Sequence, residues 1–318
     1  MNSHPLDPEI AAFVEEMKRD WARHPPFMSL PLAQARSVAE TVRARWRAGG
    51  PAMRRTVDLA APTASGPLPI RLYDPGGPAP GPALIYLHGG GFTLFSIQTH
   101  DRLMREYAAA GNFRVIGVEY PLSPEAPYPA ALDQLVSLVL WLDDGEAATI
   151  GVDASRLALG GDSAGANLAL AASLRLRDEG ARFRPTALLL NYGAYDFACS
   201  DEAEALYGGP GAVLDRAEMD YYFANYLGGR GADDDPYARP VLADLADLPP
   251  AFLVIPECDI LAEQSLAMAA RMRAAGVAVA AKVYPGATHS FLEAMSVAQV
   301  ARDAIQDSAE WLRARFER

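Results

Sequence analysis

The sequence predicts an α/β fold with a mostly parallel central sheet of eight strands, helices on both faces and a helical cap. Three observations predict it. From residue 83 onward, short apolar runs alternate with segments of helical periodicity, as in a parallel sheet with right-handed crossover helices. Two helical segments before the first strand and one long insertion fall outside this alternation. Half of the 318 residues are hydrophobic, which suffices for one large domain with an appendage.

The first 50 residues are expected to form two cap helices. In Pro8–Trp21, apolar residues recur at steps of three and four, which is typical of an amphipathic helix. A second helix is expected from Leu32 to about Trp46, with Gly49-Gly50 as its stop signal. Both helices precede every strand, so we expect residues 1–50 to lie over the sheet as a cover.

The sheet is expected to begin with an antiparallel hairpin at its edge, because Met53–Leu59 and Leu68–Tyr73 alternate apolar and polar residues. Six further strands are expected, and the first of them, Ala83–Leu87, is a continuous apolar run, as a strand buried on both faces should be. They are Ala83–Leu87, Arg114–Glu119, Arg156–Leu159, Ala187–Asn191, Ala251–Ile255 and Val277–Tyr284. Helices are expected near His100–Ala110, Ala130–Leu142, Ala164–Leu176, Leu261–Ala275 and from about Val297.

The alternation is interrupted by Phe197–Leu248, which is too long for a simple connection. One helix is expected in it, around Arg216–Leu227, between two glycine-rich segments. Such an insertion is usually a lid above the carboxyl ends of the strands. We therefore expect a cap insertion at residues 197–248 and a main domain formed by residues 51–196 and 249–318.

Composition excludes several classes of protein. The net charge is −12 with no basic stripe, so nucleic acid is not an expected partner and an anionic membrane would repel the chain. The two cysteines form no disulfide framework, no metal-ligand spacing is present, and no cofactor is expected. The N-terminus does not resemble a secretory signal, and no apolar run reaches the roughly 20 residues of a membrane helix. A cytoplasmic location, as monomer or homodimer, is the expectation.

The segment Arg156–Ala172 carries a candidate nucleophile. A short apolar run leads into Gly161-Asp162-Ser163-Ala164-Gly165, and an alanine- and leucine-rich helical run follows. Strand, sharp turn and helix in this order are the geometry that lifts a serine hydroxyl out of a sheet. Gly161 and Gly165 would let the strand and the helix pass close together. Ser163 is therefore the expected nucleophile.

A serine hydroxyl needs a base within hydrogen-bond reach, and His289 is the candidate. It follows the last strand, so it should lie at the same sheet edge as Ser163. The other four histidines are less well placed: His4 and His24 lie in the cover region, His88 ends a strand, and His100 opens a helix.

The base in turn needs a carboxylate that holds its tautomer and stabilises the imidazolium. The loop after the preceding strand offers Glu257 and Asp259, on alternate positions, so only one of them should point at the histidine. We choose Asp259, which gives Glu257 the role of a loop acid or helix-start ligand. Asp196 is a more distant competitor.

Acyl transfer also needs donors for the developing oxyanion, and the glycine-rich loop at residues 88–92 can supply them. Gly89, Gly90 and Gly91 can present backbone N–H groups without obstruction by side chains. The N–H of Ala164, at a helix start, would be a further donor. A dinucleotide-binding loop is disfavoured because the glycine spacing does not match G-x-G-x-x-G.

Several motifs together resemble one known family. HGGGF at 88–92, YPLSPEAPYPAA at 120–131, GDSAG at 161–165, the run Asp259-Ile260-Leu261 and YPGATHSF at 284–291 look like the hormone-sensitive-lipase family of α/β-hydrolases. Within that family, YLHGGGF followed by THDRLMR, with NYGAY at 191–195, is similar to the bacterial acetyl esterase branch. The resemblance runs from about Ala83 to the terminal helix.

The resemblance implies an α/β-hydrolase fold, a triad of Ser163, His289 and Asp259, and an oxyanion hole from Gly90, Gly91 and Ala164. It also implies a cap over the site and hydrolysis of small, neutral short-acyl esters, acetyl to about hexanoyl, without a cofactor or metal. In the family His88 supports the oxyanion loop. The chain departs from the family at Ile260, where proline is usual, and at Pro121, where arginine is usual.

Two other functions fit the same residues. An amide or formamide hydrolase would use the same triad with a different pocket, and a regulatory binding protein could keep the hydrolase fold. The presence of all three triad groups favours an enzyme over a binding protein. The acyl preference depends on the cap, whose candidate lining residues are Phe13, Trp21, Trp46, Tyr207, Tyr221 and Tyr222.

Overall fold

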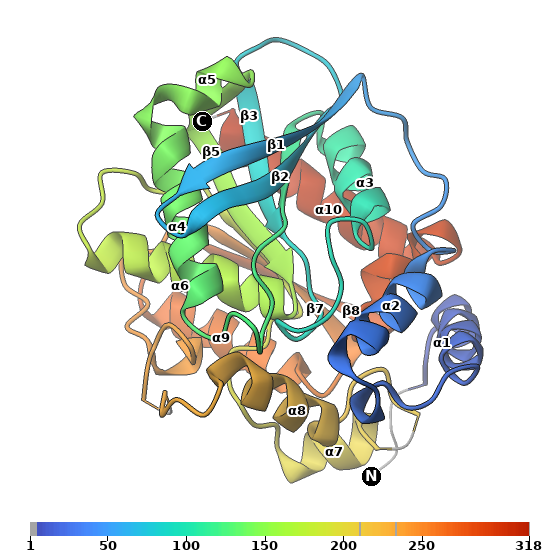
Figure 1. The fold of residues 1–318 in the computed structure, drawn as a ribbon. Coiled ribbons are helices and arrows are strands. Elements are labelled where there is room, and N and C mark those ends of the chain that lie inside the picture. Colours follow the sequence, from blue (N-terminus) through green and yellow to red (C-terminus); the bar gives the residue numbers. More distant parts are fainter. Residues whose placement is uncertain (1–4, 210, 233, 318) are drawn as a thin grey trace.

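The computed structural model describes residues 5–209, 211–232 and 234–317. Within these residues, eight strands form one sheet in the order β1-β2-β4-β3-β5-β6-β7-β8 (Figure 1). The pairs β1–β2 and β2–β4 are antiparallel, and all later neighbours are parallel. The strands are β1 (Arg55–Thr63), β2 (Gly66–Asp74), β3 (Gly81–Leu87), β4 (Arg114–Val118), β5 (Val152–Asp162), β6 (Leu188–Asn191), β7 (Ala251–Cys258) and β8 (Val279–Thr288). The predicted mostly parallel sheet of eight strands with a hairpin at one edge is confirmed.

Helices cover both faces of this sheet (Figure 1). The layer on one face is α4 (Ala130–Trp141), α6 (Ala164–Asp178) and α9 (Ala262–Ala274), and the layer on the other is α3 (Asp101–Gly111) and α10 (Gln299–Phe316). The remaining helical segments are α1 (Pro8–Trp21), η1 (Phe27–Ser29), α2 (Leu32–Arg43), η2 (Leu142–Glu146), α5 (Ala147–Thr149), α7 (Asp201–Tyr207), α8 (Arg216–Leu227), η3 (Pro240–Leu242) and η4 (Phe291–Ser296).

The apolar runs of the central strands serve two cores at once. In β3, Ile85 and Leu87 belong to the core under α4, α6 and α9, whereas Leu84 and Tyr86 belong to the core under α3 and α10. Successive side chains of a strand point to opposite faces, so a strand covered by helices on both sides must be apolar at every position. This requirement explains why β3 and β4 are almost fully buried.

Several elements differ from the sequence prediction. The hairpin strands extend to Thr63 and from Gly66, so they meet at a tight turn and not at a long turn-rich segment. The prolines that mimicked a turn lie near the sheet edge, where missing N–H donors are tolerated. Helix α2 ends at Arg43, before the predicted end at Trp46. Helix α7 was not predicted, because seven residues are too few to show helical periodicity.

The helices outside the sheet gather beyond the ends of β7 and β8 (Figure 1). They come from both predicted cap segments: α1 and α2 from residues 1–50, and α7 and α8 from residues 197–248. The two parts touch, since Phe27 stacks on Tyr222 with ring centroids 5.9 Å apart and an angle of 15°. The domain boundaries stay a prediction. Of the residues discussed above, His4 lies outside the described residues.

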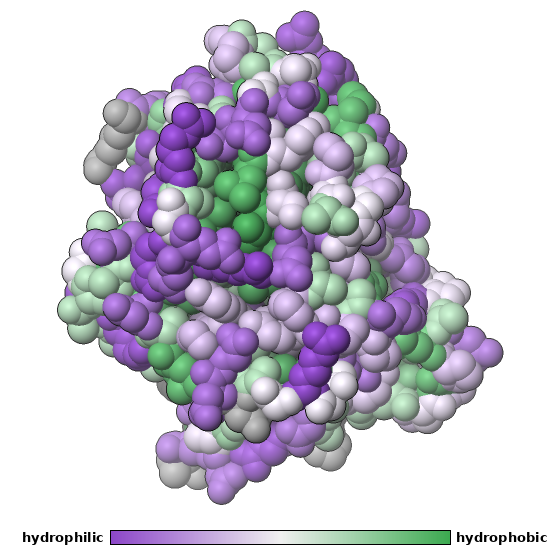
Figure 2. All heavy atoms as spheres, turned by 60° about the vertical axis from the view of Figure 1, so that its left-hand side comes forward, coloured by the Kyte–Doolittle hydropathy of each residue, from purple (hydrophilic) through white to green (hydrophobic). Residues whose placement is uncertain are grey.

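The face of the molecule in Figure 2 is mostly hydrophilic, with one group of hydrophobic residues in a recessed area and smaller hydrophobic spots elsewhere. No helix in the described part of the chain is long and apolar enough to cross a membrane. The same residues contain no cluster of three or more His, Cys, Asp or Glu side chains that could hold a metal ion. Cys199 and Cys258 are both buried cysteines in the thiol form.

Candidate active site

Ser163 occupies a strained turn between β5 and α6. Its φ of 54° and ψ of −117° lie outside the regions that non-glycine residues ordinarily adopt. The neighbouring glycines make this turn possible, because strand β3 passes directly against them. A Cβ on Gly161 or Gly165 would overlap the carbonyl oxygen of Leu87. The backbone thus pushes the Ser163 hydroxyl out of the sheet, as the sequence predicts for a nucleophile elbow.

His289 lies directly after β8 and reaches Ser163. Its Nε2 is 3.0 Å from Ser163 Oγ, although the two residues are 126 positions apart in the chain. The Tyr192 ring packs against the imidazole in a T-shaped arrangement, with ring centroids 5.1 Å apart. His289 and Ser163 are only 6% and 8% exposed, so water competes little for this contact. The serine and the histidine predicted from the sequence are therefore brought together.

Asp259 is the acid that reaches the histidine. Its Oδ2 lies 2.8 Å from His289 Nδ1, and its Oδ1 accepts a hydrogen bond of 3.0 Å from the N–H of Leu261. Glu257 instead accepts the N–H of Gly286 at 3.0 Å, in the turn that leads to His289. Asp196, the third acid considered, pairs with Arg239 at 2.5 Å.

The loop after β3 brings backbone amides next to Ser163. Gly90, Gly91 and Ala164 line the same cavity as Ser163 and His289. In the described part of the chain, no hydrogen bond uses the N–H of any of these three residues. Gly89 differs from these three residues, which corrects the prediction that its N–H is also an oxyanion donor. Its N–H donates to Asp162 Oδ1 at 3.1 Å, so this amide holds the loop to β5 and is not available to an oxyanion.

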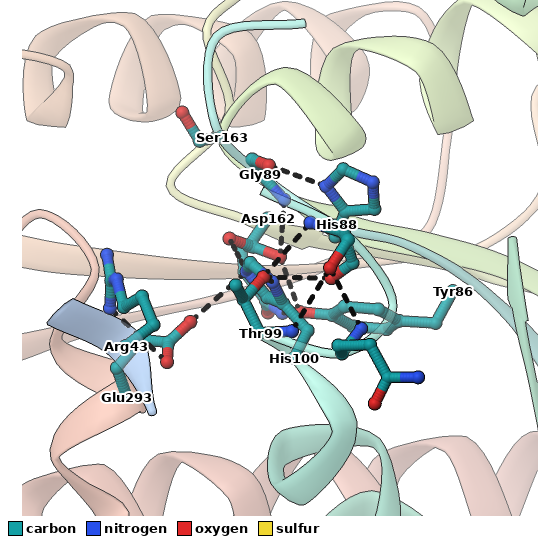
Figure 3. Close-up of polar contacts among 12 residues, drawn as sticks. Arg43, Tyr86, His88, Gly89, Thr99, His100, Asp162, Ser163 and Glu293 are labelled. Atoms are coloured by element: carbon teal, nitrogen blue, oxygen red, sulfur yellow. Dashed lines mark hydrogen bonds and ion pairs between the residues drawn. The ribbon is translucent and has the colours of Figure 1, made fainter. Parts of the chain in front are cut away.

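A network of buried charged and titratable side chains lies beneath the loop at residues 88–92, and the sequence analysis did not predict it. Figure 3 shows contacts running from Arg43 through Glu293 and His100 to Asp162, next to Gly89 and Ser163. Arg43 Nη1 is 3.2 Å from Glu293 Oε2, and His100 Nε2 is 3.1 Å from Glu293 Oε1 and 3.4 Å from Asp162 Oδ2. A signal was available, because Asp162 is a charged residue at the end of an apolar strand.

Burial and neighbouring groups act in opposite directions on the pKa values of His100 and Asp162. Burial opposes the charged form of His100, but Asp162 and Glu293 outweigh it and raise the pKa of His100 above its ordinary value. Burial likewise opposes ionisation of Asp162, but His100 and the Tyr86 hydroxyl hold its pKa below the usual range. His88 is different, because burial and the neighbouring His100 lower its pKa to about 3. His88 is therefore neutral, and its Nδ1 lies 2.7 Å from the carbonyl oxygen of Gly89.

A cavity of about 360 Å³ opens above Ser163. Of the aromatic residues proposed from the sequence as its lining, Trp21 and Tyr222 line it. The other four do not, which corrects that expectation. Phe13 and Trp46 pack on each other, Tyr221 packs on Phe27, and Tyr207 faces a neighbouring cavity. Periodicity places a ring on one face of a helix but does not say what that face meets. Phe27, Phe92, Phe95 and Phe223 complete the aromatic lining.

Comparison with known proteins agrees with this fold and site. The family described as "alpha/beta hydrolase fold" matches residues 84–293. An acetyl esterase of Salmonella agona is 37% identical over 274 residues, which cover 86% of this chain and 84% of the relative. A hyperthermophilic esterase from the archaeon Pyrobaculum calidifontis is 29% identical with a TM-score of 0.91, covering 98% of both chains. An ester-hydrolase from the metagenome of Lake Arreo is 30% identical with a TM-score of 0.91, covering 98% of this chain and 100% of the other.

The chain therefore belongs to the α/β-hydrolase fold family. It is an enzyme of the carboxylic ester hydrolase class.

Proposed function

We propose that the chain is a serine carboxylesterase that hydrolyses short-acyl esters, acetyl to about hexanoyl, through an acyl-enzyme on Ser163. The observation that carries this proposal is the continuous contact from Ser163 Oγ through His289 to Asp259, at 3.0 and 2.8 Å. A serine in hydrogen-bond reach of a histidine, which a buried carboxylate orients, is the arrangement that activates a hydroxyl at neutral pH.

In the first half of the reaction, Ser163 Oγ attacks the ester carbonyl carbon and its proton passes to His289 Nε2. Asp259 holds the Nδ1–H of the imidazole and stabilises the imidazolium that forms. The oxyanion accepts hydrogen bonds from the N–H groups of Gly90, Gly91 and Ala164, each worth about 3 kcal/mol. The bond to the alcohol oxygen then breaks, and the alcohol leaves with the proton from His289.

In the second half, water attacks the acyl carbon of the acyl-enzyme while His289 takes its proton. The same three N–H groups hold the second oxyanion. When the bond to Ser163 Oγ breaks, His289 returns the proton to Ser163 and the carboxylic acid leaves. No step requires a metal or cofactor, because the protein groups supply the nucleophile, the base and the oxyanion donors.

The proposal for the acyl group is supported by the acetyl esterase among the relatives and by the cap above the cavity. We expect initial rates on p-nitrophenyl esters from two to twelve carbons to give the highest kcat/KM between two and six carbons. A dodecanoate ester turned over as well as the acetate would contradict the proposed acyl range. The cytoplasmic location and the monomer or homodimer state stay predictions.

Replacement of the nucleophile tests the mechanism directly. Ser163→Ala removes the attacking oxygen, so kcat on p-nitrophenyl acetate should fall by about 10⁴-fold or more, leaving a residual rate from the oxyanion donors and binding. A fluorophosphonate should label the parent at Ser163 and leave the variant unlabelled. Hydrolysis by Ser163→Ala at the parent rate would show that the acyl-enzyme mechanism is wrong.

A further inference from the structure

Helix α8 of the cap rests directly on the loop that carries the oxyanion donors. The ring of Tyr222 fills the space that a side chain on Gly91 would need. A Cβ at Gly91 would overlap Cγ and Cδ1 of Tyr222 and lie 2.6 Å from Cδ2. Gly91 also has a φ of 59°, which favours glycine. The flat ring of Tyr222 thus lies against the peptide of an oxyanion donor.

The position of the Tyr222 ring is itself held by the other half of the cap. The ring stacks on Phe27 of η1 with centroids 5.9 Å apart. It also packs on a small buried cluster of Ala35 and Ala39 from α2 and Leu94 from the oxyanion loop. Residues from three separate segments therefore fix one aromatic ring, and the ring has little freedom to move away from Gly91.

The cap holds the next two residues of the loop as well. Tyr226, one helical turn after Tyr222, stacks on Phe92 with centroids 3.7 Å apart and an angle of 12°. From the other cap segment, the Nε–H of Arg36 donates to the carbonyl oxygen of Thr93 at 2.8 Å. Gly91, Phe92 and Thr93 are consecutive, so the cap contacts this stretch of the loop at every residue.

We propose that Tyr222 is a positioning residue that acts through Gly91: its ring keeps the Gly91 N–H aimed at the oxyanion of the ester-hydrolysis reaction. This inference rests on the function proposed above. A loop with three successive glycines has wide backbone freedom, and a donor stabilises an oxyanion only when it is held within about 0.5 Å of the right place. The cap therefore completes the catalytic geometry in addition to enclosing the substrate.

The test separates this role from that of a cavity wall. With p-nitrophenyl acetate, Tyr222→Ala should lower kcat by about tenfold to 100-fold, below the loss for complete removal of a donor, with KM within about twofold of the parent. Inhibition by a trifluoromethyl ketone, whose adduct carries an oxyanion, should weaken by the same factor. Tyr222→Phe keeps the ring and should retain the parent kcat. Tyr222→Leu, which keeps apolar volume without a flat ring, should lie between the two.

Tyr221→Ala is the matched control. It removes a neighbouring ring that contacts both Phe27 and Tyr222, but Tyr221 is not among the residues nearest to Gly91 and does not line the cavity. Its kcat should match the parent, and thermal unfolding should show both alanine variants folded. If Tyr222→Ala keeps the parent kcat while KM changes with acyl length, Tyr222 is only a wall and the inference is wrong. If the parent is not labelled at Ser163 by a fluorophosphonate, the proposed function fails first and this inference with it.

Discussion

At the scale of single residues, two acids at the end of β7 have different roles, because their side chains point in different directions. Glu257 and Asp259 are two positions apart, yet Asp259 contacts the imidazole and Glu257 contacts the backbone of Gly286. Both contacts serve the same histidine, one at its Nδ1 and one at the turn that carries it. The first is an interaction with the proposed base itself, so its loss should affect chemistry far more than the loss of the second.

This difference can be measured with isosteric amides. Asp259→Asn should lower kcat by about 10⁴-fold, because an amide does not hold the Nδ1–H tautomer or stabilise the imidazolium. Glu257→Gln should keep kcat within a few-fold, since its amide oxygen can still accept the Gly286 N–H. Circular dichroism and steady-state kinetics on p-nitrophenyl acetate check both variants. The reverse order of losses would assign the acid to Glu257.

At the scale of elements, helix α8 combines a strong start signal with a place above the catalytic serine. Asp215 and Glu218 form a reciprocal capping box, in which each side chain accepts the backbone N–H of the other. Glu218 also lines the cavity. Burial, and secondly the charge of Asp215, raise the pKa of Glu218 to about 7. The start of this cap helix is therefore sensitive to pH near neutrality.

The sign of this effect follows from proton binding. Glu218 keeps its proton to about pH 7 in the folded protein, whereas it loses the proton near its ordinary pKa of 4.5 when unfolded. The unfolded state then binds fewer protons between these values, so the free energy of unfolding falls as pH rises through this window. Relative to Glu218→Gln, which keeps the capping oxygen, the parent should lose about 1–3 kcal/mol between pH 5 and pH 8. Urea denaturation at several pH values measures this loss in the free energy of unfolding. If stability changes with pH in the same way in both proteins, the prediction is wrong.

At the scale of the whole molecule, a buried ion pair joins the cap to the main domain. Arg43 ends α2 in the N-terminal cap segment, and Glu293 lies in η4 after β8. Their side chains are only 5% and 3% exposed, and His100 continues the contacts to Asp162 under the oxyanion loop. The Arg43 guanidinium also lies over the Phe95 ring, 4.7 Å from its centroid. Cap and sheet are thus coupled through charges that water does not screen.

Breaking one side of this pair should be costly. Arg43→Met leaves the buried Glu293 carboxylate without its guanidinium partner, which should reduce the free energy of unfolding by about 3–5 kcal/mol. The double variant Arg43→Met/Glu293→Gln removes both charges and should lose less than the single variant. A double-mutant cycle with urea denaturation gives the coupling free energy. A loss of under about 1 kcal/mol for Arg43→Met would show that the pair does not hold the cap.

Most of the sheet could be predicted from the sequence, because a strand covered on both faces must be apolar throughout and a helix must repeat every 3.6 residues. The short helix α7 and the long hairpin strands could not, since seven residues show no clear period and prolines near an edge strand look like turns. The pairing of Ser163, His289 and Asp259 was also predictable, because residues that follow parallel strands meet at one edge.

The sequence by itself determined most of the elements, their order and the residues able to do acyl chemistry, since periodicity, glycine placement and strand ends are local properties. Only the tertiary structure decided that Gly89 gives its N–H to Asp162, that Trp21 and Tyr222 line the cavity while Phe13 does not, and that Arg43 reaches Glu293. The physical reason is the same in each case. These outcomes depend on contacts between segments far apart in the chain, and no local pattern encodes which distant group a buried amide, ring or charge will meet.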